Sequence, residues 1–319
     1  MIKILANDGI SQAGVDALTE KGFKVITEKV AQEDLINSIN SENYEVLLVR
    51  SATTVRKDLI DACPHLKIVG RGGVGMDNID VDYAREKGIN VINTPAASSS
   101  SVAELVFAHL FGMVRFLFDS NRQMPMVGDA DFKGLKKSYA NGRELAGKTL
   151  GIIGFGRIGQ EVAKRAIGLG MNVMAHDKFI DEANITLNFF NGDKKSFTIE
   201  TESLKKVLKN SDFITLHIPK NGDKPLIGAE EIGMMKTGAG IVNASRGGII
   251  DETALMFALD KEKLAYAGLD VFDNEPNPSI HICMHNAISL TPHIGAATLE
   301  AQDRIGTELA DQIATHFNK

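Results

Sequence analysis

Apolar and polar positions along the chain follow two recurring patterns. Short runs rich in aliphatic residues alternate with longer segments in which apolar positions recur with a helical period. The first series predicts strands at Ile2–Ala6, Lys24–Thr27, Val46–Val49, Ile68–Gly70 and Asn90–Ile92, with helical segments such as Gln12–Lys21 and Gln32–Asn40 between them. The second predicts strands at Thr149–Ile153, Asn172–Ala175, Phe213–Leu216, Gly240–Asn243, Tyr266–Asp270 and Ala287–Leu290. Such alternation is typical of parallel sheets with right-handed crossovers, so we expect an α/β protein with two doubly wound, Rossmann-like domains.

The segment between the two series predicts the domain boundary. Pro95 and the serines at 98–101 indicate a loop that ends in a helix cap, followed by a long helix from about Ser100 to Ser120. A last helical pattern runs over Leu299–Phe317. If this helix returns to the first domain, the second domain is an insertion in the first.

One local pattern predicts a β-hairpin. Asn191-Gly192 lies between two runs with apolar residues at alternate positions, 185–189 and 197–199. Asn-Gly favours a two-residue turn because both positions tolerate positive φ. The hairpin is either a surface decoration or a flap that faces a ligand.

Composition narrows the class of protein. Apolar residues make up 44% of the 319 residues and charged residues 24%, which excludes a disordered chain, a fibre and a small disulfide scaffold. Thirty-five basic against 41 acidic residues give a net charge of −6, so the basic footprint of a nucleic-acid partner is missing. Cys63 and Cys283 are far apart and in no metal-ligand spacing, so we expect reduced thiols and no metal.

No segment predicts a membrane partner. The N-terminus is typical of a strand, not of a signal peptide. The most apolar stretch, Val102 to Phe118, contains Glu104, His109 and Arg115, which are too polar for a span. We expect a core or interface helix there and a cytoplasmic protein.

A dinucleotide fingerprint follows the first strand of the second series. In Gly154-Phe155-Gly156-Arg157-Ile158-Gly159, the first glycine allows the tight turn, the second lets the backbone approach a pyrophosphate, and the third lets helix and strand pack closely. The N-terminus of the helix that follows offers main-chain N–H groups to the phosphates.

An acidic residue decides the expected cofactor. Asp177 ends the next strand, 23 positions after Gly154, where it would accept hydrogen bonds from the ribose hydroxyls. A carboxylate there repels a 2′-phosphate, so we expect NAD, although the nearby Arg157 and Lys178 leave NADP open.

Three polar groups that follow predicted strands suit hydride transfer on a 2-hydroxy acid. Arg246 could hold a carboxylate, His293 could exchange the hydroxyl proton, and Glu275 could orient the His293 ring. Because ligands bind at the carboxyl ends of parallel strands, all three could face one crevice. Taken singly, an arginine after a strand is more often a surface group, and a Glu-Pro is usually a solvated turn.

Several segments together resemble the D-2-hydroxyacid dehydrogenase family along essentially the whole chain. Within the family, the likeness is strongest to the branch that oxidises 3-phospho-D-glycerate to 3-phosphohydroxypyruvate, the entry to serine biosynthesis. The segments are LLVRSATTV, IVGRGGVGMDNID, GINVINTPAASSSSVAEL, GKTLGIIGFGRIGQEVA, NASRGGIIDE, GLDVFDNEP and TPHIGAAT.

The resemblance implies both an architecture and a site. A substrate domain of residues 1–97 plus 293–319 would enclose an NAD domain of residues 98–292, and the NAD domain would form a homodimer. Arg246, Glu275 and His293 match the family's catalytic set. The matching cofactor positions are Gly154, Gly156, Arg157, Ile158, Gly159, Asp177, Ile218, Ala244, Ser245, Asp270 and Gly295. The matching substrate positions are Arg50, Arg71, Gly73 and Val74, with Arg246 and His293.

The finer assignments implied by the resemblance depend on few residues. Arg50 and Arg71 would bind a phosphate, unless they are surface arginines, and Lys136 and Lys137 of a neighbouring subunit could contribute. The sequence departs from the family in the added hairpin, in serines where some relatives carry a substrate-binding asparagine, and in the expected absence of a C-terminal regulatory domain. A hydroxypyruvate or glyoxylate reductase, a D-lactate-type dehydrogenase and a non-catalytic NAD-sensing protein remain alternatives.

Overall fold

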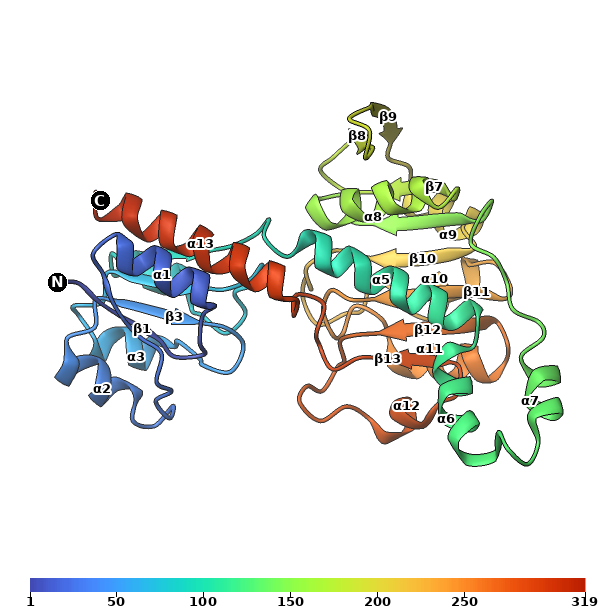
Figure 1. Ribbon diagram of the computed structural model, residues 1–319, viewed down its shortest axis with the longest axis horizontal. Helices are drawn as coiled ribbons and strands as arrows, with labels where there is room; N and C mark the ends of the chain where they lie inside the picture. The colour runs from blue at the N-terminus through green and yellow to red at the C-terminus, as the bar shows by residue number, and fades with distance from the viewer. Residues whose placement is uncertain (319) are drawn as a thin grey trace. The chain divides into compact units, whose positions relative to one another are not determined.

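The computed structural model describes residues 1–318, which form two compact units (Figure 1). The first consists of Met1–Ser101 and the C-terminal segment that begins at Ala296, and the second is Val102–Gly295. Each contains one parallel sheet, which confirms the expected α/β class.

The sheet of the first unit has the order β2-β1-β3-β4-β5. Its strands are β1 Lys3–Ala6, β2 Lys24–Ile26, β3 Val46–Val49, β4 Ile68–Arg71 and β5 Asn90–Asn93. Helices α2 Leu35–Glu42, α3 Lys57–Ala62 and α4 Val81–Glu86 cover one face, and α1 Gln12–Glu20 and α13 Leu299–His316 cover the other. The final helix therefore packs on the N-terminal sheet, with Ile305, Leu309 and Ile313 buried.

The sheet of the second unit has the order β13-β12-β11-β10-β6-β7. Its strands are β6 Thr149–Ile153, β7 Asn172–His176, β10 Phe213–Leu216, β11 Ala239–Asn243, β12 Leu264–Leu269 and β13 Ile288–Leu290. Its helices are α5 Ser99–Val114, α6 Leu117–Val127, α7 Phe132–Ser138, α8 Arg157–Gly168, α9 Leu204–Asn210, α10 Ala229–Met234, α11 Glu252–Asp260 and α12 Ile280–Met284. Two of these strands, β6 and β10, have the expected bounds, and the ends of the others differ from the expected ones by at most two residues.

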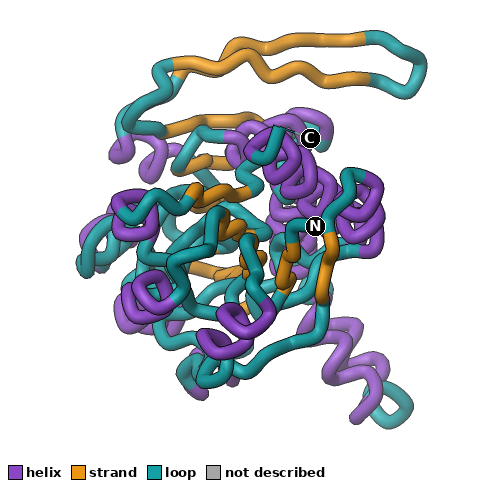
Figure 2. The backbone as a smooth tube through the Cα atoms, turned by 90° about the vertical axis from the view of Figure 1, so that its left-hand side faces the viewer, coloured by secondary structure: helices purple, strands orange, loops and turns teal. Residues whose placement is uncertain are grey.

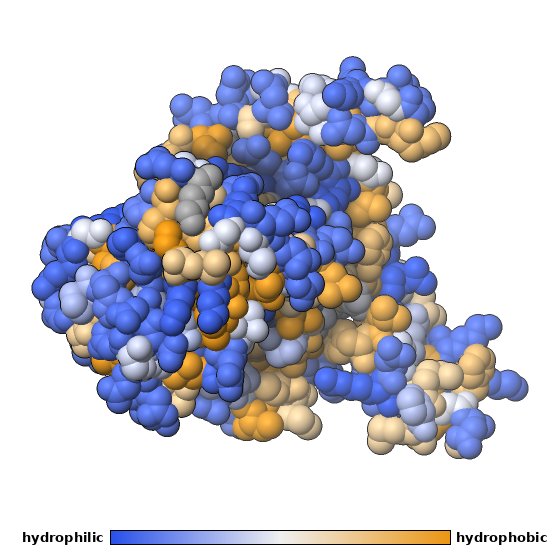
Figure 3. Space-filling model, turned by 60° about the vertical axis from the view of Figure 1, so that its left-hand side comes forward, coloured by the Kyte–Doolittle hydropathy of each residue, from blue (hydrophilic) through white to orange (hydrophobic). Residues whose placement is uncertain are grey.

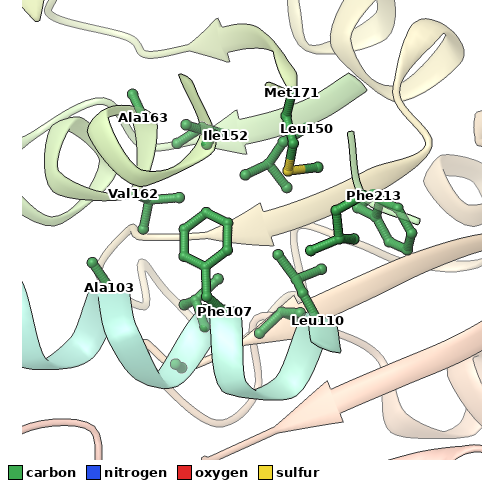
Figure 4. Close-up of a cluster of buried hydrophobic side chains, with 14 of the residues drawn as sticks. Ala103, Phe107, Leu110, Leu150, Ile152, Val162, Ala163, Met171 and Phe213 are labelled. Carbon is green, nitrogen blue, oxygen red and sulfur yellow. The ribbon is translucent and has the colours of Figure 1, made fainter. Parts of the chain in front are cut away.

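Two apolar cores cover the two faces of this sheet. On one face, Phe107 and Leu110 of α5 point toward Leu150 and Ile152 of β6, beside α8 (Figure 4). On the other face, α9, α10 and α11 pack against β10, β11 and β12. The buried helix α5 also contacts β13, since His109 Nδ1 lies 2.8 Å from Ser289 Oγ.

The expected continuous helix from about Ser100 to Ser120 is wrong. It breaks after Val114, and Phe116 adopts a left-handed conformation with φ 54°. The polar Arg115 is exposed at the break, and Phe116 instead turns its ring against Tyr139 and Tyr266. The helical spacing of apolar residues in the sequence continues across this point, so the contacts of Phe116 with the two tyrosines override the local preference for a continuous helix.

The hairpin is confirmed, but its expected two-residue turn is wrong. β8 Glu182–Asn188 pairs with β9 Lys194–Glu200 and projects from the unit (Figure 2). Phe189 N donates to Asp193 O at 2.9 Å, so the loop has three residues and ends with Gly192 at φ 90°. Ile185 is buried in the core, whereas Phe190 in the loop is fully exposed. Apolar groups gather at the outer end of the hairpin (Figure 3).

Candidate active site

The glycine fingerprint of residues 154–159 forms the turn between β6 and α8, which we call the glycine loop, and its three glycines have different roles. Gly154 has φ 93°, and a Cβ there would overlap His217 O. A Cβ at Gly159 would overlap Gly154 O. At Gly156, by contrast, an added Cβ would meet nothing within 4 Å. The fold itself therefore requires Gly154 and Gly159, whereas Gly156 leaves open space for a group that approaches the backbone.

The start of α8 suits a pyrophosphate. Gly156 is the N-cap and supplies no side chain to cap the helix. The first turn consists of Arg157, Ile158 and Gly159, so no carboxylate of that turn competes for its main-chain N–H groups. An anion there gains these donors and the positive end of the helix dipole. The residues present thus fit the phosphates of a dinucleotide.

Asp177 ties the ends of β6 and β7 together. One carboxylate oxygen accepts a hydrogen bond from Phe155 N at 2.6 Å. The other accepts from Phe179 N at 2.8 Å and Ile180 N at 3.2 Å. The negative charge is therefore fixed beside the glycine loop, in a position that suits hydrogen bonding to the ribose hydroxyls of a dinucleotide.

His217 follows β10 and lies against the same loop. Its Nε2 pairs with Thr215 Oγ1 at 2.9 Å, and its buried Nδ1 has no hydrogen-bond partner among residues 1–318. Burial lowers the pKa of the imidazole to about 3, so the ring is neutral. Ile218 contacts the same turn, since its Cγ2 would lie 2.8 Å from a Cβ at Gly154.

Asn243 organises the loop after β11, which contains Ala244, Ser245 and Arg246. Its side-chain oxygen accepts hydrogen bonds from Ser245 N at 3.1 Å and Ser245 Oγ at 2.8 Å, and its amide donates to Arg246 O at 2.8 Å. Asn243 is buried, so this loop is held from within the sheet. A Cβ at Gly247 would overlap Phe272 O, which packs this loop against the loop that contains Glu275.

The structure brings Glu275 and His293 together. Glu275 Oε2 and His293 Nδ1 lie 2.7 Å apart, and Glu275 Oε1 accepts a hydrogen bond from Phe272 N at 3.0 Å. The carboxylate therefore favours the tautomer with the proton on Nδ1, which leaves the Nε2 lone pair available to a substrate. His293 adopts φ 54°, a left-handed conformation that is uncommon for non-glycine residues.

Asp270 holds the chain on either side of His293. It is 1% exposed and accepts hydrogen bonds from Thr291 Oγ1 at 2.7 Å, Ile294 N at 2.8 Å and Gly295 N at 2.9 Å. The sequence predicted contact of Asp270 and Gly295 with the cofactor but not this role. Parallel pairing of β12 with β13 places Asp270, which follows β12, beside the segment that follows β13.

The first unit contains the other expected substrate residues. Arg50 directly follows β3, and Arg71 ends the neighbouring strand β4, so both lie at the carboxyl edge of the same sheet. Arg50 N donates to Asp8 Oδ2 at 2.6 Å. Gly73 has φ 148°, and the Arg71 guanidinium lies against it. Val74 is 39% exposed, and its carbonyl accepts a hydrogen bond from Asn93 Nδ2.

Residues 1–318 contain no group of three or more His, Cys, Asp or Glu side chains that could hold a metal ion. In the same part of the chain, no single helix is long and apolar enough to cross a membrane. Only α5 and α6 taken together reach that length and composition, and they are bent by 56°. The inward residues of α5 are buried in the core described above.

A doubly wound sheet with a glycine fingerprint, and a histidine–glutamate pair at its carboxyl edge, define a nicotinamide-dependent oxidoreductase. Residues 107–295 match the family described as D-isomer specific 2-hydroxyacid dehydrogenase, NAD binding domain. The chain belongs to this family, which confirms the expected family and NAD as the cofactor.

Two curated relatives differ in their names. The chain is 41% identical over 98% of its length to a D-3-phosphoglycerate dehydrogenase of Methanocaldococcus jannaschii, of which it spans only 57%. It is also 41% identical to a hydroxypyruvate reductase of Thermotoga maritima, of which it covers 97%. A solved structure of NAD+-bound 3-phosphoglycerate dehydrogenase from Entamoeba histolytica matches with a TM-score of 0.77 and 29% identity, over 100% of this chain and 96% of that one.

Proposed function

We propose that this protein catalyses the NAD-dependent oxidation of 3-phospho-D-glycerate to 3-phosphohydroxypyruvate. The observation that carries the reaction type is the 2.7 Å pair of Glu275 and His293 in the same unit as the glycine fingerprint. Two arginines at adjacent strand ends of the first unit support the phosphorylated substrate.

The proposed chemistry assigns one task to each side chain. Bound NAD supplies the hydride acceptor. His293 Nε2 takes the proton of the C2 hydroxyl, and Glu275 stabilises the imidazolium that results. Arg246 pairs with the carboxylate and polarises the C2 oxygen. In the reductive direction the same imidazolium returns the proton.

The phosphate assignment depends on Arg50 and Arg71. Guanidinium groups bind phosphate through several donors at once, and two of them balance a dianion. Arg71 is held against Gly73, and the backbone of Gly73 and Val74 is proposed to receive the carboxylate end of the substrate.

A hydroxypyruvate reductase is the second candidate. The identity of 41% to the Thermotoga relative, which equals the identity to the phosphoglycerate dehydrogenase of Methanocaldococcus, supports this candidate. This enzyme would use the same residues 246, 275 and 293 but would not need two arginines directed at a phosphate. A non-catalytic NAD-sensing protein would show no turnover at all.

One assay separates the three candidates. NADH consumption is followed with 3-phosphohydroxypyruvate, hydroxypyruvate, glyoxylate and pyruvate at equal concentration. A preference of at least about a hundredfold in kcat/KM for the phosphorylated acid supports the proposal, since one charged contact contributes about 1.5–3 kcal/mol. Comparable rates on the unphosphorylated acids support the reductase, and absence of any turnover supports the sensor.

Arg71→Ala tests the phosphate contact directly. It is expected to raise KM for 3-phosphohydroxypyruvate by about tenfold or more and to leave the KM for glyoxylate nearly unchanged. Arg85→Ala, on the exposed side of α4 in the same unit, is the matched control. Equal effects of Arg71→Ala on both substrates contradict the phosphate role.

We further propose that the second unit forms a homodimer through α5, α6 and α7. In α6 and α7, both fully described, no residue is buried. Leu117, Met124 and Phe132 are 57%, 45% and 59% exposed, which is typical of an interface. Light scattering should give twice the mass of the chain for the wild type and a lower mass for Phe132→Asp. A wild-type monomer contradicts this proposal.

A further inference from the structure

A buried histidine lies in the apolar core beside the candidate active site. His109 is 2% exposed and comes from α5, whose other buried residues are mainly apolar. It faces β12 at Gly268, where an added Cβ would lie 2.9 Å from His109 Cβ. Gly268 therefore makes the space that the imidazole fills. A polar ring in this position needs partners for both nitrogens, because an unsatisfied buried polar group is costly.

Both ring nitrogens of His109 have partners on the segment that leads to His293. Nδ1 lies 2.8 Å from Ser289 Oγ, and Nε2 lies 3.0 Å from Thr291 Oγ1. Thr291 Oγ1 in turn donates to Asp270 Oδ1 at 2.7 Å. Two hydroxyl groups thus connect α5 to the buried carboxylate.

The direction of each hydrogen bond follows from the chemistry of the groups. A hydroxyl has one hydrogen, and Thr291 gives it to Asp270, so Thr291 must accept from His109 Nε2. Burial lowers the pKa of His109 and keeps the ring neutral. The neutral ring then has no proton on Nδ1, which accepts from Ser289 Oγ. In this series of three hydrogen bonds, each donor therefore points toward the next group on the way to Asp270.

Asp270 connects these hydrogen bonds to the loop of residues 291–295, which contains His293. Its two oxygens hold Ile294 N and Gly295 N, the main-chain groups that directly follow His293. His293 itself has a left-handed backbone, which only a well-held loop maintains. A change in the position of the Asp270 carboxylate would therefore alter the direction of the His293 ring.

We propose that His109 is a positioning residue that acts through Thr291 and Asp270 to fix the 291–295 loop and the His293 imidazole. The inference rests on the proposed function, in which His293 exchanges the substrate proton. His109 makes no contact with the reacting atoms in this proposal. Its contribution is the Nε2–H donor, which holds the Thr291 hydroxyl in the orientation that directs its hydrogen to Asp270.

Two substitutions at His109 test the proposal. His109→Leu replaces the ring with an apolar side chain of similar size and removes the donor to Thr291. His109→Gln also removes the ring, but its amide nitrogen can still donate to Thr291. We expect His109→Leu to lower kcat by about tenfold, the loss that follows from about 1.4 kcal/mol, with the Kd of NADH within about twofold of wild type. His109→Gln should stay within about threefold of wild type in kcat.

The control is His65→Gln, a histidine of the first unit that contacts Ile39 O, which should leave kcat unchanged. A merely structural role predicts that kcat follows thermal stability and not the presence of a donor. A folded His109→Leu variant with normal kcat overturns the proposal, as does a folded His109→Gln variant as slow as His109→Leu.

A second measurement does not depend on activity. Nitrogen-15 NMR of the imidazoles, with the His109 signals assigned by their loss in His109→Gln, should show a neutral ring protonated on Nε2. A ring protonated on Nδ1, or on both nitrogens near pH 7, overturns the hydrogen-bond chain. Absence of turnover in the wild type would contradict the proposed function alone, and the NMR result would still decide the orientation of His109.

Discussion

The carboxylate of Asp177 accepts a hydrogen bond from the main-chain nitrogen of Phe155 at 2.6 Å, inside the glycine loop. The residue expected to choose between NAD and NADP is thus also part of the scaffold of the loop. Its position does not depend on a bound ribose, because three main-chain N–H groups already fix the two oxygens. The negative charge is therefore preorganised.

Asp177→Ser should weaken the binding of NADH and remove the repulsion between the carboxylate and the 2′-phosphate of NADPH. We expect the ratio of kcat/KM for NADPH to that for NADH to rise by at least about tenfold, since one charge contact changes binding by about 1.5 kcal/mol or more. Asp181→Ser removes another acidic side chain four residues away and should leave the ratio unchanged. An unchanged ratio in Asp177→Ser would show that another group discriminates between the cofactors.

The glycines at 154 and 156 should respond differently to the same substitution. Gly154→Ala forces a side chain into positive φ and onto His217 O, so it should lower the free energy of unfolding by about 2–4 kcal/mol. Gly156→Ala meets open space and should leave stability within about 0.5 kcal/mol. It should instead raise the Kd of NADH by about tenfold or more, because the methyl group lies where the pyrophosphate approaches.

Urea unfolding and titration of NADH fluorescence measure these two effects. Each variant serves as the control for the other, since the substitution is identical and the sites are two residues apart. Normal NADH binding by Gly156→Ala would mean that the pyrophosphate lies elsewhere.

The sequence could predict the features that local patterns encode. Strand and helix alternation placed the two sheets, and the spacing of Gly154, Gly156 and Gly159 identified the turn after β6. The break at Phe116 was missed because it depends on contacts with Tyr139 and Tyr266. The support that Asp270 gives to the His293 loop was also missed, since it joins strands whose pairing no local pattern shows.

His217 should make stability depend on pH. Burial lowers its folded-state pKa to about 3, whereas an unfolded histidine titrates near 6.5. The unfolded chain therefore gains a proton first as the pH falls. The contribution of this group to stability is complete above about pH 6.5 and is lost progressively toward about pH 3.

His217→Gln removes this titration. Between pH 7 and pH 5 the wild type should lose about 2 kcal/mol more of its free energy of unfolding than this variant, measured in urea. Thr215→Val removes the partner of Nε2 but keeps the ring, so it should retain the wild-type dependence on pH. Equal slopes for the wild type and His217→Gln would show that His217 takes up its proton over the same pH range in the folded and unfolded states.

Glu275→Gln should be far more damaging to catalysis than its small size change suggests. The amide oxygen can still accept from Phe272 N, but the amide nitrogen then donates toward His293 Nδ1. His293 must accept with Nδ1 and move its proton to Nε2, where it blocks removal of the substrate proton. We expect kcat for oxidation to fall by about 10²–10⁴, a typical loss of general-base catalysis, with the Kd of NADH unchanged.

His293→Ala should lower kcat by about as much, and the double variant should lower it little further, because the two residues act as one unit. Losses that multiply in the double variant would contradict the pairing seen in the structure.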